Sequence, residues 1–186
     1  MKQTVAFLPD EDSLGLGRSI RGYPVLTYRE VGLSRGASDI KVEEHGRRHN
    51  AIVLSRNRRD FRRVMRDIAR VSTSGECQAM RCKEGGGLVT VDPRLKSFNF
   101  ARVSKSLVLG GQRIDWDDVF VLNLRVHIGA DERVTVTLLP RCERCLRLHS
   151  FECERCDQIG IVTLYERQFG VVIAPPWADF ARSDER

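Results

Sequence analysis

The chain has 186 residues, a net charge of +6 and 41% hydrophobic residues, which is enough apolar material for one domain with a buried core. No apolar run approaches the roughly 18 residues that a membrane-spanning helix requires, and Met1–Pro9 lacks the pattern of a secretory signal. The sequence therefore argues against a membrane or secreted protein and favours a soluble protein of the cytoplasm or nucleus.

The first 55 residues predict loops and short strands. Glycine and serine punctuate residues 9–38, where we expect loops around one strand at Pro24–Glu30. Two further short strands are expected at Asp39–Glu43 and Asn50–Ser55.

The clearest predicted helix spans Asn57–Val71, and Ser55 or Asn57 can cap its start. Its apolar residues are spaced by 3, 1, 3 and 3 positions, which places them on one stripe of a helix. They are Phe61, Val64, Met65, Ile68 and Val71.

Positive charge is concentrated around this helix. Between Arg47 and Arg70, nine arginines and two aspartates give a net charge of +7, while the rest of the chain sums to −1. We call the candidate binding residues the arginine ridge: Arg56, Arg59, Arg62, Arg63, Arg66 and Arg70. Guanidinium groups bind phosphate in a planar two-point geometry, so the ridge predicts binding to DNA or RNA. The alternative partner is an acidic protein surface.

The chain beyond residue 86 is expected to consist mainly of strands, with a hairpin turn at Gly110–Gly111. The expected strands are Leu88–Val91, Phe98–Val103, Lys105–Leu109, Val119–Ile128, Val134–Leu139, Ile159–Tyr165 and Phe169–Ala174. The predicted fold is α+β, with mainly antiparallel strands, one basic amphipathic helix and a small zinc-stabilised lobe. We expect a single domain over residues 1–186, with a division into 1–75 and 86–186 as the alternative.

Two Cys-x-x-Cys pairs stand within residues 140–158, and their cysteines are Cys142, Cys145, Cys153 and Cys156. Two such pairs can enclose one tetrahedral Zn²⁺, and four thiolates leave no open position for a reacting water. The spacing resembles the paired knuckles of zinc ribbons, although Leu146 and Asp157 stand where that family often has glycine. The resemblance implies a structural zinc lobe, in which His149 is the alternative to one sulfur.

Cys77 and Cys82 form a weaker pair. We expect them to be ordinary free cysteines. The alternative is a second metal site completed by His45 or His49.

Two groups of carboxylates suit a metal-dependent nuclease. One group is Asp39, Glu43 and Glu44, and the other is Asp115, Asp117 and Asp118. No nucleophile or nucleotide-binding motif accompanies them. We therefore expect a non-enzymatic regulatory protein, stabilised by zinc, that binds nucleic acid through the arginine ridge. The alternatives are a protein–protein interaction factor, directed at a host or a complex, and the nuclease.

The cysteine pairs predict about one equivalent of Zn²⁺ per folded chain. Cys145→Ser should remove the metal and unfold the lobe, because zinc contributes on the order of 10 kcal/mol to folding in small zinc peptides. Cys77→Ser is the matched control and should retain the metal. Elemental analysis of the purified proteins measures this, and well under one equivalent in the wild type would contradict the site.

Overall fold

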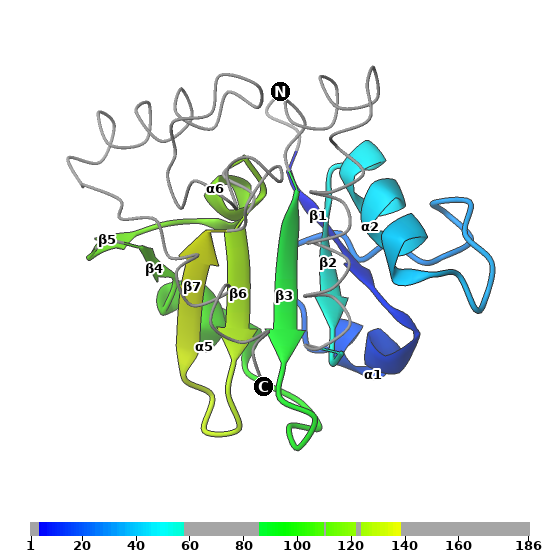
Figure 1. Ribbon diagram of the computed structural model, residues 1–186. Coiled ribbons are helices and arrows are strands. Elements are labelled where there is room, and N and C mark those ends of the chain that lie inside the picture. The colour runs from blue at the N-terminus through cyan, green and yellow to red at the C-terminus, as the bar shows by residue number, and fades with distance from the viewer. Residues whose placement is uncertain (1–3, 58–85, 110, 122–123, 139–186) are drawn as a thin grey trace, which may run out of the picture.

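The computed structural model describes residues 4–57, 86–109, 111–121 and 124–138 (Figure 1). They form a five-stranded sheet of order β1-β2-β3-β6-β7 and a two-stranded hairpin, β4-β5. The strands are β1 Ala6–Pro9, β2 Ala51–Ser55, β3 Gly87–Val91, β4 Val108–Leu109, β5 Gln112–Arg113, β6 Leu124–Ile128 and β7 Val134–Leu138. The helices are the 3-10 turn η1 Glu11–Ser13, α1 Leu14–Gly17, α2 Asp39–Arg48, α5 Phe100–Lys105 and α6 Trp116–Val121.

The sheet is mostly parallel, so the expectation of mainly antiparallel strands is wrong. β1, β2, β3 and β6 pair in parallel, and β7 pairs antiparallel with β6. β2 and β3 are buried at every position, so they appear in the sequence as continuous apolar runs without the alternation of a half-exposed strand. The coarser α+β assignment is confirmed, because helices and a mixed sheet are both present.

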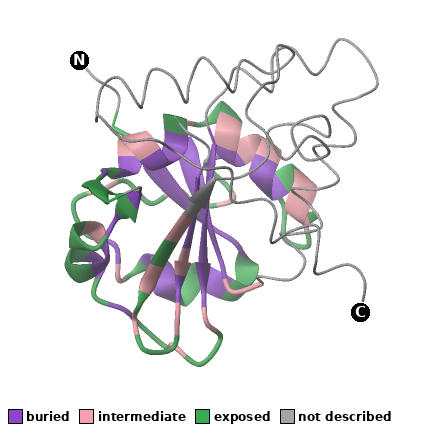
Figure 2. Ribbon diagram, turned by 60° about the vertical axis from the view of Figure 1, so that its left-hand side comes forward, coloured by how far each residue is buried: buried purple, intermediate pink, exposed green. Residues whose placement is uncertain are grey.

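Two hydrophobic layers cover opposite faces of the sheet (Figure 2). The face that we call the α2 face carries Leu8, Val53 and Leu88, which form a cluster with Val42 of α2. The other face, the α5 face, carries the larger cluster, to which α1, α5 and α6 contribute. The crossovers therefore cover both sides of the parallel strands, and the ends of the strands remain as the place for a site.

Residues 39–43, expected as a strand, are the first half of helix α2. The buried positions Val42, Glu43 and Gly46 follow helical spacing, which a search for the period-2 alternation of a strand does not detect. A side chain at Gly46 would bring its Cβ to 3.0 Å from Val53 Cγ2, so glycine permits the close approach of α2 to β2.

The expected strand Phe98–Val103 is largely helix α5. The Asn99 side chain accepts a hydrogen bond from the Arg102 backbone amide at 3.1 Å and so caps the helix. Phe100 and Val103 then lie three residues apart on its buried side. The neighbouring expected strand Lys105–Leu109 is reduced to Val108–Leu109.

The expected strand Val119–Ile128 is helix α6 followed by strand β6. Asp115 and Asp118 each accept a hydrogen bond from the other's backbone amide, at 2.8 and 2.9 Å. This reciprocal capping starts a helix just before the apolar residues that resemble a strand.

The remaining expectations divide into three groups. The strands at 50–55 and 88–91, the strand from Val134 as far as Leu138 and a hairpin that pairs Leu109 with Gln112 are confirmed. The expected strand Pro24–Glu30 is one isolated bridge, from Val25 to Phe7, followed by a turn. The predicted helix beyond Asn57, the strands at 159–165 and 169–174 and the lobe at 140–158 lie outside the described residues.

Trp116 is the main support of the α5 face and a direct test of this core. It is 1% exposed, stacks on Phe100 at 5.3 Å and meets Phe7 edge-on at 5.1 Å. Trp116→Ala should lower the free energy of unfolding by about 3–5 kcal/mol, as deletion of a buried aromatic ring does. Val108→Ala, at an exposed position, should change it by less than about 0.5 kcal/mol. Chemical unfolding measures both, and equal effects would contradict this packing.

Candidate functional site

The carboxyl ends of β1, β2, β3 and β6 lie at one edge of the sheet, the lower edge in Figure 1. We call this the carboxyl edge. Ligands of open parallel sheets bind outside such an edge, because the loops that leave the strands meet there. Polar residues follow the strands at this edge, beginning with Asp10 after β1 and Asp92 after β3.

Asp10 is the most unusual of these residues, because it is a carboxylate that is only 6% exposed. Its backbone amide donates to Leu54 O at 2.9 Å, which continues the β1–β2 pairing and sets Asp10 beside Ser55. Among the described residues, nothing forms a hydrogen bond with Asp10 Oδ1. A buried carboxylate oxygen without a donor is costly, and it marks a position where a cation would be stabilised.

Burial raises the pKa of Asp10 above its ordinary value, and the negative charges of Asp12 and Asp39 raise it further. The hydroxyls of Ser55 and Ser13 oppose the shift, although Ser13 Oγ does not reach hydrogen-bond geometry with any described residue. Asp10, Asp12 and Asp39 together form what we call the acidic site.

The elements around the acidic site explain how these residues meet. Asp12 lies in η1, directly after β1, and Asp39 is the first residue of α2. Glu11 Oε1 accepts a hydrogen bond from the Gly36 amide at 2.7 Å, which ties the loop before α2 to η1. Gly36 has a φ of +74°, a conformation that glycine adopts without strain.

Tyr28 adds a neutral hydroxyl to this region. Burial, followed by the charges of Asp10, Glu11 and Asp39, raises the pKa of Tyr28 to about 12. The phenol therefore stays protonated at neutral pH and can donate a hydrogen bond next to the carboxylates.

A polar row crosses the α2 face at the carboxyl edge. Its members occupy neighbouring positions on four adjacent strands: Asp10, Ser55, Thr90 and His127. Ser55 is paired with Thr90, and Thr90 with His127, whose Nδ1 lies 3.0 Å from Thr90 Oγ1. Apolar residues occupy the neighbouring positions on the α5 face, so the polarity belongs to one face of this edge.

The sequence-predicted carboxylates separate into different roles. Asp39 lies in the acidic site, whereas the buried Glu43 pairs with Arg47 one helical turn along. Glu44 is half-buried on α2. Asp39 is therefore the member of this group that the structure brings to the carboxyl edge.

The second predicted group lies at the opposite edge of the sheet, near the start of β1 (Figure 1). Asp117 Oδ1 accepts a hydrogen bond from the Val5 amide at 3.3 Å. Asp115 and Asp118 cap α6. Local structure thus accounts for this group, and it lies apart from Asp10.

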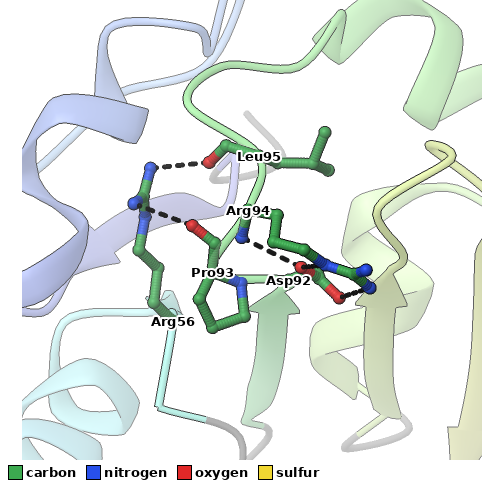
Figure 3. Close-up of polar contacts among 5 residues, drawn as sticks. All are labelled: Arg56, Asp92, Pro93, Arg94 and Leu95. Carbon is green, nitrogen blue, oxygen red and sulfur yellow. Dashed lines mark hydrogen bonds and ion pairs between the residues drawn. The ribbon is translucent and has the colours of Figure 1, made fainter.

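Arg56, the one ridge residue that the structure describes, makes contacts within the protein (Figure 3). It follows β2, and its guanidinium donates to Pro93 O at 3.5 Å and Leu95 O at 2.7 Å. Asp92, in the same loop, receives three hydrogen bonds from Arg94. Arg56 thereby fastens the loop after β3 to the end of β2.

The other predicted site residues lie elsewhere. Arg59, Arg62, Arg63, Arg66 and Arg70, the cysteines Cys77, Cys82, Cys142, Cys145, Cys153 and Cys156, and His149 all lie outside the described residues. His45 Nδ1 contacts Val31 O at 2.6 Å and His49 Nδ1 contacts His45 O at 2.9 Å, so both rings are held by backbone carbonyls.

A hollow of about 440 Å³ opens on the α5 face near the ends of β3 and β6. Its polar lining includes Arg21, Asn99 and Glu132. Asn99 caps α5 and Glu132 pairs with Arg102 at 3.4 Å, so these groups already have partners. The hollow offers space beside the carboxyl edge, whereas the buried carboxylate with an unsatisfied oxygen, Asp10, belongs to the acidic site.

Sequence reasoning missed Asp10, Asp12 and the polar row. The available signal was the short apolar run Val5–Pro9 ending in three consecutive acidic residues, the pattern of a buried strand followed by a polar edge. His127 and Thr90 gave no signal, because their proximity depends on the parallel pairing of β3 with β6.

Within the described ranges, no group of three or more His, Cys, Asp or Glu side chains is arranged to hold a metal ion. No helix in these same ranges is long and apolar enough to cross a membrane. Comparisons with protein-family models, curated proteins and solved structures give no match.

The raised pKa of Asp10 predicts that its charge destabilises the folded protein at neutral pH. As the pH rises above 3.8, the unfolded state ionises first, and the penalty is complete above the folded-state pKa. Asp10→Asn should therefore raise the unfolding temperature near neutral pH, by a few degrees for each kcal/mol recovered. This gain should shrink as the pH falls towards 3.8. Thermal unfolding across pH measures it, and a variant that is less stable at pH 7 would contradict the assignment.

Proposed function

We propose that this protein is a metal-dependent nuclease whose reaction centre is the acidic site. The observation that carries the proposal is Asp10, a buried carboxylate with an oxygen that no described residue satisfies, at the carboxyl edge of a parallel sheet. Perturbed ionisable groups in such positions are candidates for function. The proposal favours the enzymatic alternative over a protein that only binds nucleic acid.

Asp10 and Asp39 are the residues that we assign to a divalent cation. Mg²⁺ binds through one or two carboxylates and completes its shell with waters and substrate phosphates, so it does not need a preformed group of three protein ligands. A cation beside Asp10 would also remove the cost of its buried charge. Asp12 adds negative potential that favours the same cation.

The reaction is hydrolysis of a phosphodiester. Water attacks phosphorus, the bond from phosphorus to one ester oxygen breaks, and the departing alkoxide takes up a proton. Bound Mg²⁺ supplies charge neutralisation for the phosphate and a more acidic water. Asp10 and Asp39 fix the ion, and Tyr28 offers a neutral donor next to them.

The arginine ridge supports nucleic acid, DNA or RNA, as the substrate. Asn57, the residue that precedes the basic segment in the sequence, lies just after β2 at the same edge as the acidic site. Arginine supplies the affinity for phosphate that an acidic reaction centre lacks. We infer a location in the cytoplasm or nucleus, where nucleic acid is present and the cysteine pairs stay reduced for zinc.

A cleavage assay tests this function. Labelled single-stranded and duplex DNA and RNA are incubated with the protein and Mg²⁺ or Mn²⁺, and omission of both cations should abolish cleavage without removing the predicted structural zinc. Asp10→Asn should lower the cleavage rate at least ~100-fold, because it removes the ligand carboxylate and with it the charge stabilisation of the reaction. Asp39→Asn should have a similar effect.

Asp117→Asn is the matched control, because it removes a carboxylate at the opposite edge while its side-chain oxygen can still accept from Val5. It should cleave within about twofold of the wild type. All variants are purified in the same way, so a contaminating nuclease would give the same activity in every preparation. Metal-dependent cleavage that persists in Asp10→Asn would refute the proposal. So would a wild-type protein that cleaves none of the substrates.

A further inference from the structure

Two Asp-x-Arg turns lie near the carboxyl edge and share the hydrogen bond from the arginine amide to the aspartate side chain. In the first, Arg94 N and Nε each donate to Asp92 Oδ1 at 2.9 Å, and Arg94 Nη2 donates to Asp92 Oδ2 at 3.0 Å. In the second, Arg133 N donates to Asp131 Oδ1 at 3.1 Å and Arg133 Nε lies 3.0 Å from Asp131 Oδ2. Both arginine side chains are highly exposed, at 79% and 89%.

The two turns differ in how they are attached to the sheet. The loop of Asp92 and Arg94 follows β3, and Arg56 holds its backbone through Pro93 O and Leu95 O (Figure 3). Arg56 in turn directly follows Ser55, the neighbour of Asp10. The loop of Asp131 and Arg133 is the turn between β6 and β7, one strand farther from β1.

We propose that Arg94 binds a backbone phosphate of the nucleic-acid substrate, and that Asp92 is its partner only in the free protein. This inference rests on the proposed function and adds a substrate-binding residue to it. β3 is two strand spacings from β1, about 10 Å, and the Arg94 guanidinium lies on the side of the loop away from Arg56 (Figure 3), so a phosphate at Arg94 would lie outside the scissile position, farther along the nucleic-acid strand.

The exchange of partners is physically easy. The Arg94 side chain is 79% exposed although Asp92 is only 18% exposed, so solvent screens the pair on the arginine side and a phosphate can reach the guanidinium. The guanidinium fork fits a phosphate as well as it fits a carboxylate. Asp92 keeps its hydrogen bond from the Arg94 amide after the exchange, and Arg56 keeps the loop in place, so the Arg94 side chain is the part that needs to move.

Binding is measured by fluorescence anisotropy in the Asp10→Asn background, which prevents cleavage, without added Mg²⁺ or Mn²⁺. Labelled single-stranded RNA and single-stranded DNA of mixed sequence are separate arms. Arg94→Ala should weaken binding roughly tenfold, the loss of a charge-assisted contact. It should also reduce the slope of log affinity against log salt by about 0.7, the loss of one phosphate contact on a single strand.

Arg133→Ala is the matched control, because it makes the same change of charge in a turn with the same hydrogen bond from the arginine amide. It should weaken binding by less than about twofold and leave the salt slope unchanged. Asp92→Asn should have the opposite effect on affinity. The substitution weakens the ion pair that holds Arg94 in the free protein, so the protein should bind the oligonucleotide more tightly. If the pair merely shapes the loop, Asp92→Asn should weaken binding instead.

Equal effects of Arg94→Ala and Arg133→Ala, or weaker binding by Asp92→Asn, would overturn the inference. The cleavage assay with wild-type protein separates this result from the proposed function. Metal-dependent cleavage with no special role for Arg94 refutes the inference alone. A tenfold loss of binding in Arg94→Ala without any cleavage supports a phosphate contact and refutes the nuclease.

Discussion

The parallel pairing of β1, β2, β3 and β6 is the constraint on which the other features depend. Parallel strands must be joined by crossovers, and these crossovers cover both faces of the sheet. The residues that follow each strand are then left at one edge. Residues remote in the sequence, such as Asp10 and Asp92, come to the same edge for this reason alone.

The same pairing explains why one buried carboxylate has a raised pKa. Asp10 continues the pairing of β1 with β2, so its backbone is fixed at a position where the residue is only 6% exposed. Asp39 is brought close by the start of α2, which the Glu11–Gly36 bond holds. The buried charge of Asp10 lowers the free energy of unfolding. A cation bound beside the carboxylate would offset that loss.

Local patterns were predictable from the sequence where one residue type decides the structure. The apolar run of β2, the hairpin glycines between β4 and β5 and the turn before β7 were identified in this way. α2, α5 and α6 were not, because each buries only two or three residues, which is too few for helical spacing to stand out in the sequence. Their capping residues, Asn99 and the pair Asp115 and Asp118, were the more informative signal. In the candidate site, Asp39 was among the predicted carboxylates, but Asp10 and the polar row depend on strand order, which no local pattern contains.

The reversed direction of β7 determines at which edge of the sheet the last described strand ends. Asn57 follows β2 at the carboxyl edge, so the arginine-rich segment departs from the side of the acidic site. Leu138 ends β7 at the opposite edge, one strand length or about 17 Å away, and the segment with the paired cysteines departs from there. One antiparallel strand therefore places the last described residue of the sheet on the side opposite to Asp10.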